Sequence, residues 1–319
     1  MRVSVVISVY NSAAYIGDAV ESILNQSEKS LELVVVNDGS NDETLSILCG
    51  YDDPRIKIIN LPHNCGIATA RNVAMSCLNG DYLAVMDADD ISLPARLEMQ
   101  LAFLDNNPCV HIVGGRIIRS AEDLGSEIDR PEHPIADSEI KANLLLLNGS
   151  AMIHPTMMAR MSFIRKHSLM YPPPPRGRVG IDHEFWIKCV ARGAVFENIA
   201  EILLVKRRHS GNVTLLNQDP LISQKKTLSR ADILSLYYPE LSTRESQALA
   251  ALFELNHQLR IRDVSIGLAA GHKALLDATS HYGESKPHLR LILEGTIARW
   301  LDALAPRTGG GIYTKLRCG

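Results

Sequence analysis

Stretches of apolar residues alternate with amphipathic stretches along the first hundred residues of the chain. The apolar stretches are short and rich in β-branched residues, which is typical of strands buried on both faces of a parallel sheet. The amphipathic stretches repeat their apolar positions every three or four residues and therefore predict helices. We expect strands at residues 2–9, 31–36, 55–61 and 82–86, and helices after Ser12, after Ser40, at 66–78 and at 94–106.

Local signals indicate where these helices begin and end. Asn11 or Ser12 can cap the first helix, and Ser40 with Glu43 has the spacing of a capping box for the second. Asn79-Gly80 closes the third helix, and Pro94 opens the fourth. Strands that alternate with helices predict an α/β fold, in which a mostly parallel sheet carries helices on both faces.

The pattern becomes less regular after Cys109. A proline-rich loop is expected at residues 171–177 and a flexible tail after Pro306. The sequence therefore predicts two regions, an α/β domain over residues 1–215 and a helical C-terminal extension over residues 216–319. Within these regions we expect strands at 110–118 and 151–158, helices at 138–147 and 181–192, two short strands around Val195 and Leu203, and mostly helices from Leu221 onward.

Composition and charge narrow the class of protein. The 319 residues are 46% hydrophobic and 22% charged, as in a globular protein with a substantial core. The net charge of −3 gives no overall attraction to nucleic acid, so we expect no nucleic-acid partner. The six cysteines form no Cys-x-x-Cys pair, which argues against a zinc site and fits reduced thiols in a cytosol. We expect no signal peptide, because Met1 leads directly into a strand, and no apolar run approaches the roughly 18 residues of a membrane span.

Three aspartates follow the fourth predicted strand, namely Asp87, Asp89 and Asp90. Ligands of open parallel sheets bind beyond the carboxyl ends of the strands. If the strand continues, Asp87 and Asp89 point to the same side and form a hard-oxygen site for Mg²⁺ or Mn²⁺. The alternative is a turn in which aspartates cap a helix, and Asp90 is the one we expect to be a cap or to lie behind the ligands.

Two further polar groups lie at the same expected edge of the sheet. Asn37-Asp38 can accept hydrogen bonds from a nucleobase or a ribose, and Gly39 permits a tight turn after them. A type I turn with a helix cap explains the same residues equally well. Arg71 can bind a diphosphate through its planar guanidinium, although pairing with a structural acid is the alternative.

The ordered set of motifs resembles the family 2 glycosyltransferases of the GT-A fold. The resemblance covers roughly residues 3–215 and implies a Rossmann-like GT-A fold that transfers a sugar from a nucleotide diphosphate with inversion. Two positions depart from the family pattern: Ser8 stands where proline is common, and Ile181 where glutamate is common. The matching stretches are residues 5–11, 34–40, 64–72 and 80–90, His154-Pro155-Thr156 and the helix around Asp182.

The resemblance also implies roles for single residues. Asp182 matches the acidic residue that serves as catalytic base; an acid that stabilises a helix N-terminus is the alternative. His209 resembles a late histidine that completes the metal site, so that the metal ligands would be Asp87, Asp89 and His209. The implied nucleotide-sugar-binding residues are Val9, Tyr10, Asn11, Asn37, Asp38, Gly66, Arg71, Asp87, Ala88, Asp89 and His154, the last of which can also be an ordinary hydrogen-bonded histidine.

We therefore expect an enzyme of polysaccharide biosynthesis that uses Mn²⁺ or Mg²⁺, a nucleotide-sugar donor (foremost a UDP-sugar) and a glycan or lipid-linked glycan acceptor. Two other classes stay open. A sugar-phosphate nucleotidylyltransferase would want a glycine- and arginine-rich loop where Asn11-Ser12-Ala13-Ala14 stands. A catalytically silent nucleotide-sugar-binding module is the second, and the retained Asp87, Asp89, Asp182 and His209 argue against it.

The C-terminal third contains no catalytic motif but an amphipathic helix. This face predicts packing against the α/β domain or against another copy in a homo-oligomer; contact with a membrane surface is the alternative. We accordingly place the protein in the cytoplasm, with the inner face of the membrane as the alternative location. The apolar face consists of Leu289, Leu293, Ile297, Trp300 and Leu304.

Overall fold

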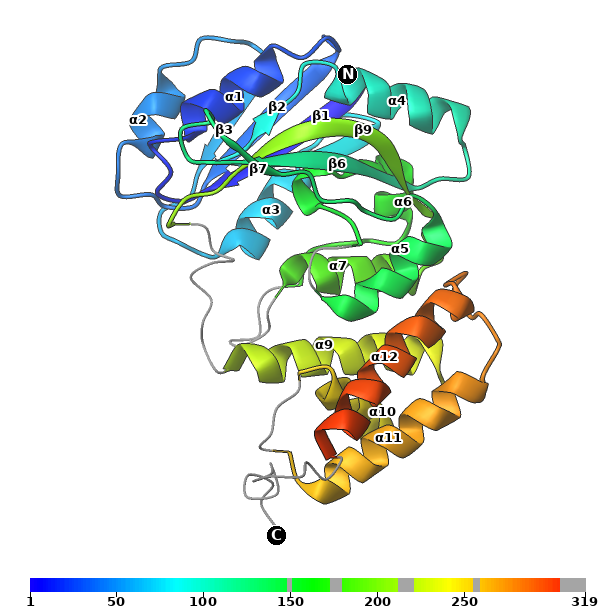
Figure 1. Cartoon of the computed structure of the whole chain (residues 1–319). Helices are drawn as coiled ribbons and strands as arrows, with labels where there is room; N and C mark the ends of the chain where they lie inside the picture. The colour runs from blue at the N-terminus through cyan, green and yellow to red at the C-terminus, as the bar shows by residue number, and fades with distance from the viewer. Residues whose placement is uncertain (148–150, 173–179, 212–220, 255–258, 305–319) are drawn as a thin grey trace. The chain divides into compact units, whose positions relative to one another are not determined.

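The computed structural model (Figure 1) describes residues 1–147, 151–172, 180–211, 221–254 and 259–304. The chain groups into two compact units. Unit 1 comprises Met1–Ala136, Met152–Pro175 and Glu184–Asn217, and unit 2 comprises Asp137–Ala151, Arg176–His183 and Gln218–Gly319. The expected proline-rich loop, from residue 173 on, and the expected flexible tail after Pro306 lie outside the described residues.

Unit 1 is built on one sheet with the strand order β3-β2-β1-β4-β8-β6-β9-β5, and β7 (Glu127–Asp129) pairs with β6. β1 (Val3–Val9) lies parallel between β2 (Leu31–Asn37) and β4 (Tyr82–Asp87), and β3 (Ile56–Asn60) extends this parallel part beyond β2. The prediction of an α/β fold with a mostly parallel sheet is confirmed. The second half contains β5 (Ile91–Ser92), β6 (Ile112–Ser120), β8 (Met158–Arg160) and β9 (Phe196–Arg207).

Helices flank both faces of this sheet (Figure 1). α1 (Ile16–Leu24), α2 (Thr44–Cys49) and α4 (Arg96–Asn106) lie on one face, and α3 (Ile67–Met75) lies on the other. Because side chains alternate along a strand, each strand contributes to both layers. The apolar residues of α1 and α4 pack with every second strand residue, among them Val3, Val5, Ile7, Leu33, Val35, Ala84 and Met86.

Two helix starts differ from the prediction. α1 begins after Tyr15 without a side-chain cap, and the backbone carbonyl of Ser12 accepts from the N–H groups of Tyr15 and Ile16. The capping box of Ser40 and Glu43 is also wrong, because Glu43 itself is the N-cap of α2 and makes no side-chain cap bond. The Ser40 hydroxyl donates instead to Asn37 Oδ1 at 2.5 Å. The Ser40 oxygen also accepts from the Asn11 backbone N–H at 2.9 Å, so the hydroxyl joins two loops and caps no helix.

Two strand predictions also need correction. The strand expected at 151–158 is wrong for most of its length: His154–Thr156 forms a short 3₁₀ turn, η2, and only β8 follows it. Pro155 explains the change, because proline cannot donate to a strand ladder. The two short strands expected around Val195 and Leu203 are one strand, β9, which pairs with β6 across irregularities near Gly115 and Arg116.

Unit 2 is helical within the described residues. α12 (Lys286–Leu304) buries Leu289, Leu293, Ile297 and Trp300 of its predicted apolar face, whereas Leu304 is only partly buried. The Trp300 indole donates to the Leu252 carbonyl at 2.7 Å. The boundary between the units falls within α7 (Ile181–Val190), after His183. Among the helices that the structure describes, none is long and apolar enough to cross a membrane. The other helical elements are α5 (Asp137–Asn143), η1 (Leu144–Leu146), α9 (Leu221–Tyr237), α10 (Thr243–Leu252) and α11 (Ile261–Leu276) in unit 2, and α6 (Met161–Lys166) in unit 1.

Candidate active site

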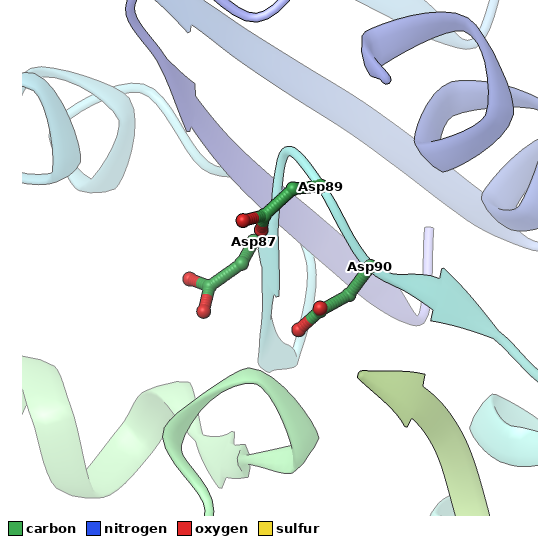
Figure 2. Close-up of side chains that lie close together, drawn as sticks. All are labelled: Asp87, Asp89 and Asp90. Carbon is green, nitrogen blue, oxygen red and sulfur yellow. The ribbon is translucent and has the colours of Figure 1, made fainter. Parts of the chain in front are cut away.

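The turn after β4 gathers three carboxylates. β4 ends at Asp87, and Ala88, Asp89 and Asp90 form the turn that follows (Figure 2). One oxygen from each aspartate lies within 4.8 Å of the others. Asp87 and Asp89 thus come together through a turn and not through the continued strand that the sequence predicts. Several hard oxygen donors in one place fit the coordination chemistry of Mg²⁺ or Mn²⁺.

Asp90 is part of this cluster but is more buried than Asp87 and Asp89, and it caps no helix. Its side chain is fully buried, whereas α4 has Ala95 as its N-cap. The Asp90 carboxylate accepts from the Arg207 backbone N–H at 3.1 Å and lies 3.3 Å from the Lys206 ammonium. Burial raises the pKa of Asp90 because it disfavours the charged carboxylate.

His209 joins the cluster from the end of β9. Its Nε2 lies 2.9 Å from Asp89 Oδ2, although 120 positions separate the two residues in the chain. The structure therefore brings the three predicted metal ligands Asp87, Asp89 and His209 into one region of unit 1. Carboxylates suit both Mn²⁺ and Mg²⁺, whereas an imidazole nitrogen suits Mn²⁺ better than the harder Mg²⁺.

Positive charge surrounds the acidic cluster. Arg71, which is almost fully buried on α3, pairs with Asp87 at 3.0 Å, and Lys206 lies 3.4 Å from the same carboxylate. Burial opposes the charge of Lys206, but the carboxylates of Asp90, Asp87 and Asp89 outweigh it and raise the pKa of the lysine. Burial lowers the pKa of Arg96 to about 10, against the opposing influence of the Asp90 and Asp87 carboxylates.

Sequence reasoning missed Lys206 and Arg96. Lys206 begins the basic run Lys206-Arg207-Arg208 that precedes His209, and this run is a signal that could have pointed to it. Arg96 lies on an ordinary amphipathic helix, where an arginine usually faces solvent. Its contact with the Val85 carbonyl exists only because α4 packs on the sheet, and Gln100, one turn further along α4, accepts from its Nε.

The predicted nucleotide-binding residues after β1 and β2 tie three loops together. Asp38, almost fully buried, accepts from the backbone N–H groups of Cys65 at 2.7 Å and Gly66 at 2.9 Å. Its own N–H donates to the Val9 carbonyl at 2.8 Å. Asn37 is fully buried, and its amide donates to Asn60 Oδ1 at 2.7 Å. These contacts join loops and cap no helix, and the φ of +69° at Gly39 is not that of a central residue of a type I turn. The contacts to base and ribose stay predictions.

Tyr10 and Asn11 form the exposed rim beside these loops. The Tyr10 ring is 45% exposed, whereas Val9 before it and Ala88 on the aspartate turn are buried. Asn11 has a φ of 49° and accepts from the Asn41 backbone N–H at 2.9 Å. An exposed aromatic ring at the carboxyl end of a strand offers a stacking surface to a flat ligand.

His154 belongs to an aromatic cluster under α7. It is buried, its Nε2 lies 2.8 Å from the Tyr171 hydroxyl, and its ring lies 5.4 Å from that of Trp186. The Arg71 guanidinium lies over the same Tyr171 ring, 5.4 Å from its centroid. His154 is therefore linked through Tyr171 to the residues around Asp87, and it also fits the alternative of a hydrogen-bonded core histidine.

Asp182 lies in the first turn of α7, in the part of that helix that belongs to unit 2. The next residue is His183, whose pKa burial lowers to about 4 against the opposing charge of Asp182. The structure thus groups the predicted nucleotide and metal residues in unit 1 and Asp182 in unit 2. The role of Asp182 as a base stays a prediction.

Comparison with known proteins agrees with this fold. The sequence model of "Glycosyl transferase family 2" matches residues 4–168. A protein of Haemophilus influenzae described as an uncharacterized glycosyltransferase is 31% identical over 241 residues, which are 72% of this chain and 73% of that protein. The putative teichuronic acid biosynthesis glycosyltransferase TuaG of Bacillus subtilis is 35% identical over 149 residues, 45% of this chain and 58% of TuaG.

Among solved structures, residues 1–349 of S. aureus TarS in complex with UDP-GlcNAc superpose with a TM-score of 0.63 at 18% identity, covering 95% of this chain and 89% of the TarS chain. The sheet, its helices and this match define the GT-A fold. The family match and the Haemophilus relative take the assignment one step further: the chain belongs to glycosyltransferase family 2. This assignment favours glycosyl transfer over nucleotidyl transfer and over a silent binding module.

Proposed function

We propose that the protein moves a sugar from a nucleotide diphosphate to an acceptor hydroxyl, with metal assistance and with inversion at the anomeric carbon. The observation that carries this proposal is the cluster of Asp87, Asp89 and Asp90 oxygens within 4.8 Å of one another, with the His209 imidazole beside Asp89. A UDP-sugar is the expected donor, and the UDP-GlcNAc complex of the TarS structure supports that choice.

In this proposal the loops after β1 and β2 bind the nucleoside. Asn37 and Asp38 contact base and ribose, and the exposed ring of Tyr10 stacks beside them with Val9 and Asn11. The network from Asp38 to Gly66 supports the proposal because it fixes the shape of these loops before a donor arrives. Arg71 and Lys206 supply fixed positive charge toward the diphosphate. Ala88 lines the turn, and His154 holds the Tyr171 side chain in place through its hydroxyl.

Asp87, Asp89 and His209 would hold the Mn²⁺ or Mg²⁺ ion. A divalent cation there supplies charge stabilisation for the departing diphosphate. The carboxylate of Asp182 accepts the proton of the acceptor hydroxyl while that oxygen attacks the anomeric carbon. A positioned base of this kind contributes roughly 10²–10⁴ in rate. A single displacement with one base and no enzyme nucleophile inverts the configuration.

The acceptor in this proposal is a glycan or a lipid-linked glycan, and the process is polysaccharide biosynthesis. The similarity to TuaG, named for teichuronic acid biosynthesis, supports this class of acceptor. We place the protein in the cytoplasm and include the inner face of the membrane in that proposal. We also propose that the chain forms a homo-oligomer. Exposed apolar side chains on α12, Leu291 and Leu301, suit either a membrane surface or a second copy.

A thermal-shift screen of UDP-sugars with and without Mn²⁺ tests donor binding. A ligand at a hundredfold excess over its Kd stabilises the folded state by about 2.7 kcal/mol. We expect stabilisation by one UDP-sugar that needs Mn²⁺ and disappears in Asp89→Ala, whereas the exposed Asp123→Ala retains it. Equal stabilisation in EDTA, or full stabilisation of Asp89→Ala, would contradict the metal-bound donor.

A further inference from the structure

Three side chains from separate elements stack behind Asp89. Arg207 ends β9, Tyr15 is the N-cap of α1, and His209 follows β9 by two residues. The Arg207 guanidinium carbon lies 5.1 Å from the centroid of the Tyr15 ring. On the histidine side, the Tyr15 and His209 ring centroids lie 4.4 Å apart, with 35° between the ring planes. The phenol ring of Tyr15 thus contacts both the guanidinium and the imidazole.

Arg207 fixes the backbone of the aspartate turn. Its side chain is almost fully buried, and its Nε donates to the Asp89 backbone carbonyl at 3.1 Å. One terminal nitrogen donates to the Glu122 carbonyl at 2.8 Å, and the other pairs with Asp18 at 2.7 Å. The planar guanidinium therefore joins α1, the β6–β7 connection and the aspartate turn, which a lysine at this position cannot do.

Tyr15 fixes the imidazole side of the same turn. Its hydroxyl donates to Glu122 Oε1 at 2.5 Å, so the ring is held at both its edge and its face. The His209 ring packs on it and presents Nε2 to Asp89 Oδ2 at 2.9 Å. Both the backbone of Asp89 and the ring of His209 are therefore set by Arg207 and Tyr15. Groups that orient metal ligands are known to change metal affinity strongly without touching the metal.

We propose that Arg207 and Tyr15 are positioning residues that set the geometry of the Asp89–His209 pair and thereby the affinity of the site for a divalent cation. This inference rests on the proposed function, in which Asp89 and His209 hold the metal. Neither Arg207 nor Tyr15 touches the reacting atoms. Arg207→Lys keeps the charge but loses the fork, Tyr15→Leu loses the ring, and Tyr15→Phe loses only the hydroxyl.

Arg160 offers a matched control in the same unit. It lies on β8 beside Tyr82, the first residue of β4, whereas Asp87 is the last residue of that strand. Like Arg207 it lies over a tyrosine ring, with 5.7 Å between its guanidinium carbon and the Tyr82 centroid, and it donates to the carbonyls of Val110, Leu104 and Asn107. Arg160→Lys therefore removes a similar set of contacts far along the strand from the aspartates.

The test is the Kd for Mn²⁺ alone, measured on the full chain by electron paramagnetic resonance, with a urea unfolding curve for each variant. We expect Arg207→Lys and Tyr15→Leu to raise the Kd by about tenfold to a hundredfold. Tyr15→Phe should raise the Kd less than Tyr15→Leu does, because its ring still packs on His209. Arg160→Lys should lose stability and leave the Kd unchanged.

The outcomes separate this inference from the proposed function. If Arg207→Lys and Tyr15→Leu bind Mn²⁺ as the wild type does, the positioning role is wrong and the metal site stands. The same holds if Arg160→Lys weakens Mn²⁺ binding equally, since the effect then follows from lost stability. A wild-type chain that binds no Mn²⁺ would overturn the proposed metal site and the positioning role together.

Discussion

Lys206 is the residue whose charge is most closely tied to the acidic cluster. Its ammonium lies within 3.4 Å of Asp87 and 3.3 Å of the fully buried Asp90. Asp87 also pairs with Arg71, at 3.0 Å, whereas Asp90 also accepts from the Arg207 backbone N–H, which carries no full charge. Loss of the ammonium should therefore destabilise the charged carboxylate of Asp90 more than that of Asp87.

Replacing Lys206 by methionine should destabilise the protein in a pH-dependent way. Removing one partner of a buried ion pair costs roughly 3–5 kcal/mol, and it raises the pKa of Asp90 further. A carboxylate with a raised pKa contributes stability that is lost as the pH rises above its ordinary value of 3.8. Urea unfolding should show a larger deficit for Lys206→Met at pH 8 than at pH 5. Equal deficits at both pH values, or the same behaviour in the exposed Lys188→Met, would contradict this.

Glu32 has the opposite kind of pKa shift. This buried carboxylate accepts from the Ser4 hydroxyl at 2.5 Å and from the Asn79 backbone and side chain at 2.6 and 3.1 Å. Burial opposes its charge, but the hydrogen bonds outweigh burial and lower the pKa. A lowered pKa gives stability that is present above the ordinary value of 4.5 and is lost as the pH falls through the folded-state value.

Glu32→Gln should therefore lose stability at neutral pH but not in acid. Hydrogen bonds to a charged group are worth about 1.5–3 kcal/mol each in net stability, which sets the expected deficit at pH 7. The difference from the wild type should shrink as the pH falls well below 4.5, because the wild-type carboxylate is then protonated. Urea unfolding at several pH values measures this. A stability deficit of Glu32→Gln that stays constant down to acidic pH would contradict this, because it would mean that the charge of Glu32 does not contribute to stability.

At the scale of elements, the connection after β2 depends on Gly39. Its φ is +69°, and a Cβ added there would lie 2.4 Å from the His63 carbonyl carbon. Gly193, after α7, has a similar φ of +76° but no heavy atom within 4 Å of an added Cβ. The two glycines therefore separate the cost of left-handed backbone from the cost of a close approach between two loops.

Gly39→Ala should destabilise the protein more than Gly193→Ala does. A side chain in the left-handed region costs about 1–2 kcal/mol, which is the expected loss for Gly193→Ala. Gly39→Ala adds a collision with backbone that the long loop before α3 must absorb, and it should also weaken donor binding. Chemical unfolding of both variants measures the difference. Equal losses would mean that the loop at His63 moves freely.

The elements differ in how well local sequence predicts them. β1 and β2 were predictable because a strand buried on both faces must be apolar throughout. The caps of α1 and α2 were not, because Ser40 bonds to Asn37 at the end of β2 and accepts from the Asn11 backbone N–H, 29 positions earlier in the chain. β9 was predicted as two pieces, since its exposed middle residue Glu201 interrupts the apolar pattern of a strand that β6 nevertheless keeps continuous.

At the scale of the whole molecule, the candidate site was predictable where it depends on strand ends. Asp87 and Asp89 follow β4 and Asp38 follows β2, and parallel strands bring such ends to one edge of the sheet. Lys206, Arg207 and Tyr15 were not predictable, because their contacts with residues 87–90 and with one another depend on how β9 and α1 pack. Contacts between residues more than 100 positions apart leave no periodic pattern in the local sequence.

The division into units follows the fold and not the chain order. The segment Asp137–Ala151 and the start of α7 group with the C-terminal helices. Within unit 2, the Tyr237 hydroxyl donates to the Lys141 carbonyl at 2.8 Å, and the Lys141 ammonium donates to the Tyr282 carbonyl at 2.6 Å. These contacts tie α5 to α9 and to the connection between α11 and α12, which follow it by about a hundred positions or more. The expected boundary between residues 215 and 216 stays a prediction.

The most direct test of the account is the release of UDP from a UDP-sugar by the wild type and by Asp182→Asn, with Mn²⁺ and with EDTA. We predict that wild-type release requires Mn²⁺ and that Asp182→Asn lowers it by about 10²-fold or more, while donor-induced thermal stabilisation is unchanged. Asp263→Asn, which alters a first-turn acid of α11, should behave as the wild type. Near-normal release by Asp182→Asn, or release that continues in EDTA, would contradict the account.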